Sequence, residues 1–501
     1  MRGRQCPGSL YLLKTHPEFR SSPSAAGQNL FRQGHRVGKL AWNLFPDGLD
    51  LSPANFSDLH AWAARTEDSL KTSSVNFYEA AFLKNGMFCA ADILHKENDS
   101  YSIYEVKSST SLYEHYIEDA AVQYFILKHC GISLKNISII YINREYQRGQ
   151  TLDLKKLFRI ESVLNEAESI QGEINNEMAF LQNMLETGKK PEFKIGPHCM
   201  SPRECDFKNY CWKDIPSPSV FEIAGMNYQE RFALYDNGII NYSDFNDDAL
   251  NQLTPSQKIQ IVSGRSRKDY IQTNSLQEFI NELQYPLHFL DFECMMQPVP
   301  EIIGAKPYQH IPFQYSLHII ASPDSSAAHK EFLADETTPD PRHEWILNLL
   351  DDINENGKIL AYNASYETMI LRMIADAFPE LKRRIETLLP RFTDLALPFR
   401  KKYIYKPEMK GSFSIKNVLP AIFPDLKGYE HLNIADGLSA MNAFLGLRED
   451  IKNPSNPAVR KDLLEYCRMD TLAMVKILGY IQKILKNEKI PSERISNSES
   501  E

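Results

Sequence analysis

Two separate groups of acidic residues follow short apolar segments of this chain, and each group limits the folds that the chain can adopt. The first group is Asp92, Glu105 and Lys107, and the second is Asp291, Glu293, Glu367, Tyr466 and Asp470. Carboxylates that a fold brings together have raised pKa values and cost stability unless a cation compensates them. Magnesium prefers such oxygen ligands, and a pair of magnesium ions can grip a phosphodiester. The sequence therefore predicts two metal-dependent centres in two successive domains.

The length and charge of the chain set its broad class. Its 501 residues are enough for two or three domains with sizeable cores. The formal net charge of −9 argues against a broadly basic surface that coats nucleic acid non-specifically. No segment approaches the roughly 20 apolar residues of a membrane span, and no secretory apolar run follows the basic residues after Met1. We expect a cytoplasmic protein without a membrane partner.

The order of the segments predicts an α/β protein with several parts. The predicted parts are a first α/β domain over 1–215, a linker of short helices over 216–282, a second domain over 283–490 and a disordered polar tail over 491–501. The boundary after the first domain is marked by Pro216-Ser-Pro-Ser219. The second domain places strands before helices, which favours a mixed sheet flanked by helices.

The first acidic group lies on predicted strands of the first domain. The elements expected here are strands over 88–94, 102–107 and 137–142, a helix over 112–128 and a long helical stretch over 157–187. Asp92 is expected to end its strand, and Glu105 and Lys107 share one face of the next strand because they are two residues apart. Two carboxylates can hold a magnesium ion while the lysine orients or activates the attacking water. The alternative is a solvated strand face that bears a Glu and a Lys.

This pattern resembles the PD-(D/E)XK nucleases of the RecB-like type, which include the CRISPR adaptation exonucleases. The resemblance implies a RecB-like restriction-endonuclease fold in which Asp92, Glu105 and Lys107 are catalytic residues. Gln123, in the helix that follows, would be the glutamine that completes the site. The resemblance also implies a metal-ligand histidine upstream, for which His35 is the candidate; the alternative for His35 is an exposed histidine on a helix.

The second acidic group combines a strand with two helices. The second domain opens with an apolar strand that is expected to end in Asp291 and Glu293, both on one face. Glu367 follows a further strand at the start of a helix, and Tyr466 and Asp470 lie four apart on one helical face. Four carboxylates from separate elements can bind two metal ions about 3.5–4 Å apart.

These residues resemble the DEDD exonucleases of the ribonuclease-H-like fold, in the subclass whose third motif is Tyr-x3-Asp. The metal ligands that the resemblance implies are Asp291, Glu293, Glu367 and Asp470. Tyr466 would orient the nucleophilic water, and Asp394 matches an accessory acid. The second motif of the family usually ends in Asp, whereas this chain has Glu367. The alternative is a domain that keeps the fold without catalysis.

The eight cysteines are unevenly distributed, and in a cytosolic chain we do not expect disulfides. Four of them are enough to close a metal or cluster site, and these are Cys6, Cys199, Cys205 and Cys211. One N-terminal cysteine plus three after the nuclease core resembles the iron–sulfur staple of RecB-like exonucleases, which implies a 4Fe–4S cluster. Zinc and a set of unrelated thiols are the alternatives. The remaining cysteines are expected to be buried or incidental thiols, and these are Cys89, Cys130, Cys294 and Cys467.

These patterns predict a nuclease that uses Mg²⁺ or Mn²⁺. We expect a DNA exonuclease of repair or mobile-element defence, with single-stranded DNA or DNA ends as its partner. One alternative is a nucleic-acid-binding scaffold with one or both centres inactive, and another is an RNA-processing exonuclease. The segment from Arg400 to Lys406 alternates bases with tyrosines, as a single-strand stacking groove or a solvated loop would. Residues 223–240 loosely resemble a phosphate-gripping helix-hairpin-helix, with a plain helical linker as the alternative.

The whole chain also resembles a bacterial family in which a RecB-like nuclease precedes a DEDD-type domain. The likeness is carried by the segments Cys294–Ile320 and Gly411–Pro420. It implies the domain order and no substrate.

Overall fold

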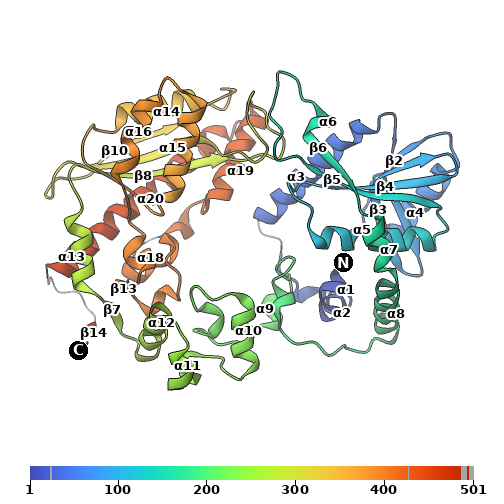
Figure 1. Ribbon diagram of the computed structural model, residues 1–501, viewed down its shortest axis with the longest axis horizontal. Coiled ribbons are helices and arrows are strands. Elements are labelled where there is room, and N and C mark those ends of the chain that lie inside the picture. The colour runs from blue at the N-terminus through green and yellow to red at the C-terminus, as the bar shows by residue number, and fades with distance from the viewer. Residues whose placement is uncertain (23–24, 427, 487–493, 496–501) are drawn as a thin grey trace. The chain divides into compact units, whose positions relative to one another are not determined.

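The computed structural model describes residues 1–22, 25–426, 428–486 and 494–495, and the chain divides into two compact units (Figure 1). Unit 1 comprises Met1–Lys213 and Met296–Gln309, and unit 2 comprises Asp214–Met295 and His310–Glu501. The short segment Met296–Gln309 therefore interrupts the sequence of unit 2 and belongs by its contacts to unit 1. Both units combine helices with a mixed sheet, so the predicted α/β class is confirmed.

Unit 1 is built on a six-stranded sheet with the order β1-β2-β3-β4-β5-β6. Its strands are β1 (Leu49–Asp50), β2 (Asn76–Lys84), β3 (Met87–Glu97), β4 (Ser100–Lys107), β5 (Leu134–Ile142) and β6 (Phe158–Ser162). Strands β2, β3 and β4 pair antiparallel, β4 and β5 run parallel, and β6 pairs antiparallel with β5. Because β3 continues to Glu97, Asp92 lies inside the strand and not at its end as predicted.

Helices cover both faces of this sheet. Helix α5 (Glu114–His129) connects the parallel strands β4 and β5, which need such a crossover. All residues from Ala120 to Leu127 are buried, and they form one core with β2, β3 and β5. Helix α3 (Ala25–Ala41) packs Val37 and Ala41 on the opposite face, beside Ile140.

The remaining helices of unit 1 are α1 (Arg2–Gln5), α2 (Pro7–Thr15), α4 (Leu59–Ser69), α6 (Leu154–Leu157), α7 (Leu164–Ser169), α8 (Gln171–Thr187) and α9 (Lys208–Cys211). The prediction of one helical stretch over 157–187 was wrong in its first part. Residues Phe158–Ser162 form the edge strand β6, in which Phe158 is buried and the next four residues are exposed. The apolar residues Phe158 and Ile160 alternate with polar residues, which is typical of a strand and not of a helix.

Unit 2 begins with short helices. They are α10 (Tyr228–Asp236), α11 (Asp247–Asn251), α12 (Pro255–Ser266) and α13 (Thr273–Asn281). The first three start at the side-chain caps Asn227, Asn246 and Thr254, which accept backbone N–H groups that the helix leaves unpaired. A small core that includes Ile223 and Tyr242 lies between them.

A three-stranded sheet follows these helices. Strand β7 (Asp269–Ile271) pairs antiparallel with β13 (Ile404–Tyr405) and parallel with β14 (Arg494–Ile495). Strand β14 falls within the tail that was predicted to be disordered, and the rest of that tail lies outside the described residues.

The main sheet of unit 2 has five strands in the order β10-β9-β8-β11-β12. They are β8 (Leu287–Met295), β9 (Ile311–Ile320), β10 (Ala328–Leu333), β11 (Lys358–Ala361) and β12 (Phe392–Asp394). Strands β8, β9 and β10 are antiparallel neighbours, while β8, β11 and β12 run parallel. Because β8 continues to Met295, Asp291 and Glu293 lie inside the strand and not at its end as predicted.

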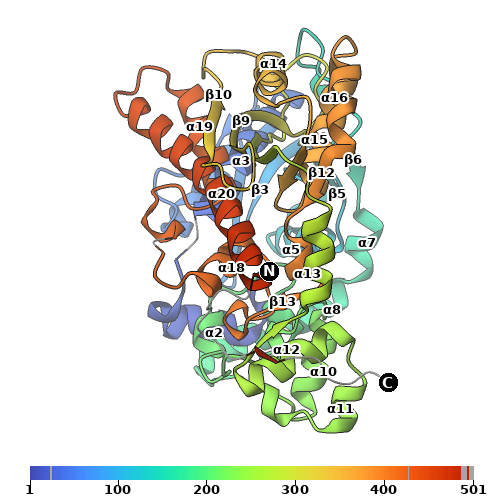
Figure 2. The same ribbon diagram turned by 90° about the vertical axis from the view of Figure 1, so that its left-hand side faces the viewer.

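Two layers of helices enclose this sheet. Helices α14 (Arg342–Asp352), α15 (Ser365–Ala377) and α16 (Lys382–Leu388) share a core with Leu290 and Phe292 of β8. The other face carries α20 (Asn456–Leu485) (Figure 2). The hydroxyl of its Thr471 hydrogen-bonds with Ser316 and His318 of β9. The side chains of β8 alternate, so Asp291 and Glu293 face α20. The remaining helices are α17 (Leu397–Arg400), α18 (Ile415–Ile422) and α19 (Gly437–Glu449).

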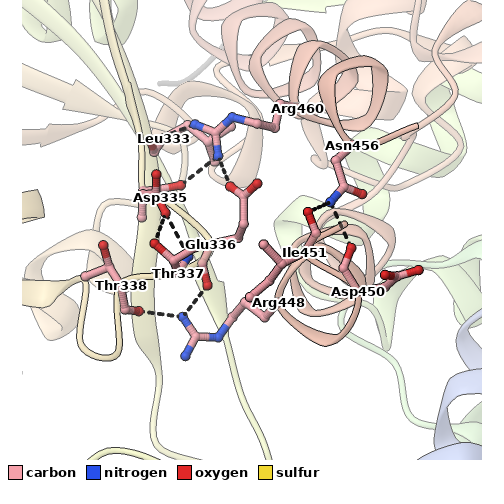
Figure 3. A network of polar contacts seen from close by, with 11 residues as sticks. Leu333, Asp335, Glu336, Thr337, Thr338, Arg448, Asp450, Ile451, Asn456 and Arg460 are labelled. Carbon is pink, nitrogen blue, oxygen red and sulfur yellow. Dashed lines mark hydrogen bonds and ion pairs between the residues drawn. The ribbon is translucent and has the colours of Figure 1, made fainter. Parts of the chain in front are cut away.

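Two arginines attach α19 and α20 to the segment that follows β10 (Figure 3). Arg460 of α20 donates to the carbonyl of Ala334 at 3.0 Å and to the carboxylate of Glu336 at 2.6 Å. Arg448 of α19 donates to the carbonyl of Thr338 at 2.7 Å. These bonds set the position of α20 against the sheet. Among the described residues, no helix combines the length and apolar character that a membrane crossing requires.

Candidate functional site

The first acidic centre lies where β3, β4 and α5 of unit 1 meet. Lys107 donates through Nζ to Glu105 Oε1 and to Asp119 Oδ2, each at 2.7 Å. Gln123 of α5 donates through Nε2 to the other oxygen of Glu105 at 2.6 Å. The structure thus brings Glu105, Lys107 and Gln123 together, and it adds Asp119, which the sequence analysis did not include.

Asp92 joins this centre from β3, opposite Glu79 of β2. Its Oδ2 accepts the backbone N–H of Val106 at 2.6 Å, which holds the carboxylate against β4. The ladder between β2 and β3 is interrupted where Glu79 faces Asp92. Glu79 has a φ of +55°, a backbone conformation that costs a side-chain-bearing residue on the order of 1–3 kcal/mol. Its carbonyl accepts a hydrogen bond from the indole N–H of Trp62 at 2.9 Å. Strain of this kind is often kept at functional positions.

Glu79 is the acid that sequence reasoning missed in this centre. The signal in the sequence is a single carboxylate between the apolar residues Tyr78 and Ala80. In the structure both of these neighbours are buried. Burial, followed by the charge of Glu105, raises the pKa of Glu79 to about 7. Burial, Glu105 and Glu79 likewise raise the pKa of Asp92.

Lys107 is the cation of this centre. Burial favours its neutral form, but the charges of Glu105 and Asp119 outweigh burial, so the pKa of Lys107 is above its ordinary value. Lys107 faces three carboxylates, which are those of Glu105, Asp119 and Asp92. Glu79 adds a fourth to the centre, and the charge of Lys39 acts on it. The excess of negative charge is what a divalent cation would compensate.

His35 lies apart from these groups. It is on α3 with an exposed side chain. Among the described residues, no contact joins it to Asp92 or Glu105, and it belongs to no grouping of potential metal ligands. Its position agrees with the alternative, an exposed histidine on a helix.

The second acidic centre lies between β8 and α20 of unit 2. Asp291 and Glu293 extend from β8, and Asp470 and Tyr466 extend from α20. The charges of Asp470 and Glu367 act on both β8 carboxylates. Asp291, Glu293 and Cys467 offer ligand atoms within 4.8 Å of one another. Two of the four predicted acids, Asp291 and Glu293, are therefore brought within 4.8 Å of each other, and Asp470 and Glu367 act on them through their charge.

Two residues that sequence reasoning missed complete the polar surroundings of Asp470. Tyr429 donates its hydroxyl to Asp470 Oδ1 at 2.5 Å. Lys416 of α18 places Nζ 5.4 Å from the ring centroid of Tyr429 and 5.6 Å from that of Tyr466. The charge of Lys416 also acts on Glu293 and Asp470. Both residues come from loops and a short helix without a regular pattern, so their spacing carries no signal.

Glu367 lies in the first turn of α15. Its side chain is 3 % exposed, and its Oε2 has no hydrogen-bond partner among the described residues. Asp394, the predicted accessory acid, accepts backbone N–H groups from Asn363 and Ala396 at 2.9 Å and pairs with Arg400 at 2.8 Å. These bonds make Asp394 a support for the turn before α15.

Burial is the main cause of the raised pKa values in this pocket. It raises the pKa of Glu367 to about 8 and that of Asp470 to about 6. Burial and the charge of Asp470 raise the pKa of Asp291 and of Glu293. Without a metal, Glu367 is therefore favoured in its protonated form near neutral pH.

A separate cavity of about 270 Å³ in unit 1 is lined by all four predicted cysteines. They are Cys6, between α1 and α2, and Cys199, Cys205 and Cys211 in the segment that ends unit 1. Burial, followed by the charges of the other three thiols, raises the pKa of Cys211 to about 11. Lysines also line the cavity, and these are Lys190, Lys194, Lys208 and Lys213.

Polar contacts join the N-terminal residues beside this cavity to residues about 200 positions later in the sequence. Arg2 donates to both oxygens of Asp206 at 2.6 and 2.8 Å. Gln5 donates to the carbonyls of His198 and Arg203, each at 2.8 Å. These contacts hold Cys6 against the three later cysteines.

The predicted stacking groove at Arg400 to Lys406 was wrong. Tyr405 and Lys402 are buried, with Lys402 Nζ 4.6 Å from the ring centroid of Tyr405. Lys406 pairs with Asp269 at 2.6 Å. Because β13 pairs with β7, the segment packs inside unit 2 and is not a solvated loop either.

Comparisons with known proteins found similarity over parts of this chain. A family model described as a domain of unknown function (DUF2779) matches residues 288–414, which include Asp291, Glu293 and Glu367. The uncharacterized protein UU173 of Ureaplasma parvum is 25% identical over 226 residues, 40% of this chain and 32% of that protein. The uncharacterized protein MG366 of Mycoplasma genitalium is 23% identical over 283 residues, 52% of this chain and 42% of that protein. The chain thus spans less than half the length of these relatives. No solved structure matches it.

The raised pKa values predict how pH changes the stability of the metal-free protein. Carboxyls with a higher pKa in the folded state bind more protons when folded, so stability falls as pH rises through the window between the two values. For Glu367 this window runs from the ordinary 4.5 to about 8. With EDTA, we expect the thermal midpoint to fall between pH 5 and 8, by about 2–4 °C for each kcal/mol lost.

Mn²⁺ should restore the midpoint at pH 8 more than at pH 5. Glu367→Gln, which stays neutral, should flatten the dependence on pH, whereas the exposed Asp376→Asn on the same helix should not. An equal slope in Glu367→Gln and in the unaltered protein would contradict the electrostatic description of this pocket.

Proposed function

We propose that this chain is a metal-dependent nuclease with one centre in each unit, and that it acts on DNA as an exonuclease. The observation that carries the proposal is the closeness of Asp291 and Glu293, which offer ligand atoms within 4.8 Å of each other and of Cys467. The charges of Asp470 and Glu367 act on both of these carboxylates. Such a group of buried acids is costly without a compensating cation. The mixed sheet with helices on both faces supports the ribonuclease-H-like resemblance of unit 2.

The residues of the second centre have separable roles in this proposal. Divalent ions held by the carboxylates would stabilise both the attacking and the leaving oxygen of a phosphodiester. Tyr466, whose hydroxyl hydrogen-bonds with Asp470, orients a water molecule beside the acids. Tyr429 holds Asp470 in place from the other side. Lys416 adds a positive charge that attracts a phosphate of the substrate strand.

The first centre supports a second cleavage site of the RecB-like type. Asp92 and Glu105 supply the carboxylates for a divalent ion, and Glu79 adds a third that faces Asp92. Lys107 carries the charge that positions a water molecule or stabilises the phosphate in the transition state. Gln123 keeps Glu105 oriented through its hydrogen bond.

The cysteine-lined cavity supports a 4Fe–4S cluster in preference to zinc. A tetrahedral zinc with bonds of about 2.3 Å would bring its sulfur ligands to about 3.8 Å from one another. In the described part of the chain, no three cysteine sulfurs lie within 4.8 Å of one another. The wider spacing and the four lysines around the cavity suit a larger, negatively charged group. Such a cluster would tie the first residues of unit 1 to its last segment.

Substitutions in each centre should separate the two activities. We expect Lys107→Ala to reduce cleavage by the first centre, and Asp291→Asn to reduce trimming by the second, each by about 10²–10³-fold. The measurement follows end-labelled single- and double-stranded DNA and RNA, with full-length protein and with Mg²⁺ or Mn²⁺. The double variant should retain binding and lose cleavage.

Matched controls lie on other elements of the same two units. Lys135→Ala removes an exposed lysine of β5 that pairs with Glu97, and Asp376→Asn alters an exposed acid of α15. Neither should change the rates. Cleavage by the double variant at the unaltered rate would contradict the assignment of both centres, and binding without cleavage by the unaltered protein would favour a scaffold. Faster cleavage of RNA than of DNA would favour RNA processing.

The cluster proposal predicts a coloured protein. Anaerobically purified protein should be brown and contain about four iron atoms per chain, as the 4Fe–4S stoichiometry requires. Cys205→Ser should lose the colour and lower the thermal midpoint, while Cys130→Ser, outside the cavity, should keep both. Colourless protein with one zinc per chain would overturn the iron–sulfur assignment and retain the ligand set.

A further inference from the structure

Cys467 is the residue of the second centre that the acidic motifs do not explain. It is fully buried in α20, directly after Tyr466 and three residues before Asp470. The spacing of three places Cys467 and Asp470 on the same helical face. The sulfur Sγ lies 3.8 Å from Asp291 Oδ2, inside the pocket that the carboxylates form.

The position of the sulfur fits a metal ligand. Asp291, Glu293 and Cys467 are the one set of three potential ligands within 4.8 Å of one another in the described part of the chain. A zinc ion with a thiolate at about 2.3 Å and a carboxylate oxygen at about 2.1 Å has these two atoms about 3.6 Å apart in tetrahedral geometry. The observed 3.8 Å between Sγ and Oδ2 is close to this value.

A second observation points to a cation in the same place. Glu367 is 3 % exposed, and its Oε2 finds no hydrogen-bond partner among the described residues. Its charge acts on both Asp291 and Glu293, so Glu367 lies near these two carboxylates. A buried carboxylate oxygen without a donor needs a cation or a proton to compensate it.

We propose that Asp291, Glu293 and Cys467 form a site for a thiophilic divalent cation of the zinc class. The inference rests on the metal centre proposed above for unit 2. Thiolates are soft ligands that prefer zinc, whereas magnesium prefers oxygen ligands. Three protein ligands leave a fourth position for water, as in catalytic zinc sites. Zinc and magnesium compete for Asp291 and Glu293, so zinc at low concentration inhibits trimming that depends on magnesium.

Cobalt(II) tests the site directly, because a thiolate bound to cobalt gives a charge-transfer band in the near ultraviolet. Full-length protein is titrated with Co²⁺, and the spectrum of Cys467→Ser is subtracted, which removes the contribution of the other cysteines. We expect a difference band that saturates at one cobalt per chain. Zn²⁺ should abolish it at equimolar concentration, whereas excess Mg²⁺ should leave it. Zinc affinity should fall in Cys467→Ser by at least about 10-fold, the loss that even outer-shell changes produce.

Two further variants keep the test decisive. Asp291→Asn leaves the thiol in the core and should also lose the band. Cys294→Ser alters a buried cysteine of β8 that packs with Leu290 and Phe292 on the opposite face, and it should keep the band. A band that is equal in the unaltered protein and Cys467→Ser would overturn the proposal.

The spectrum requires no nucleic acid, so the two proposals can fail separately. A band that depends on Cys467, without trimming of any substrate, would retain the cation site and overturn the nuclease function. Trimming in magnesium without such a band would retain the nuclease and overturn the cation site.

Discussion

Both candidate centres depend on carboxylates of like charge held close together inside a folded unit. On β8, strand geometry imposes this closeness, because Asp291 and Glu293 lie two apart and point to the same face. In unit 1, Asp92 and Glu105 come from the neighbouring strands β3 and β4. Each unit then adds a lysine, Lys107 or Lys416, which offsets only part of the negative charge. The remaining charge appears as raised pKa values and as a carboxylate oxygen without a donor in Glu367. A centre of this kind is costly when empty and gains stability when a divalent cation enters.

The surrounding structure fixes these groups before any ligand arrives. In unit 1, Gln123 orients Glu105, and the backbone of Val106 holds Asp92. In unit 2, Arg460 attaches α20, which carries Tyr466 and Asp470, to the segment after β10, and Arg448 attaches the preceding helix α19 to the same segment (Figure 3). Preorganisation of this kind reduces the cost of arranging ligands when a metal or substrate binds.

The sequence predicted the parts of each centre that follow from regular geometry. The two-residue spacing of Glu105 and Lys107, and the four-residue spacing of Tyr466 and Asp470, place side chains on one face whatever the rest of the fold does. Glu79 could not be found in this way, because its place depends on a local distortion of β2 that pairs it with Asp92. Lys416 and Tyr429 come from segments without periodicity, so only the tertiary fold brings them to Asp470.

Errors of the sequence reasoning have the same origin. The alternation of bases and tyrosines from Arg400 to Lys406 is typical of an exposed groove, but pairing of β13 with β7 buries Tyr405. Cys467 is buried, as expected for a scattered cysteine, but a single cysteine carries no pattern, so its distance of 3.8 Å from Asp291 became visible only in the fold.

The measurement that tests the central claim most directly is anomalous X-ray scattering from crystals of the full-length protein grown with Mn²⁺. The account predicts manganese peaks among Asp291, Glu293 and Asp470 in unit 2 and beside Asp92 and Glu105 in unit 1. Crystals with saturating Mn²⁺ and no peak at either group of carboxylates would contradict it.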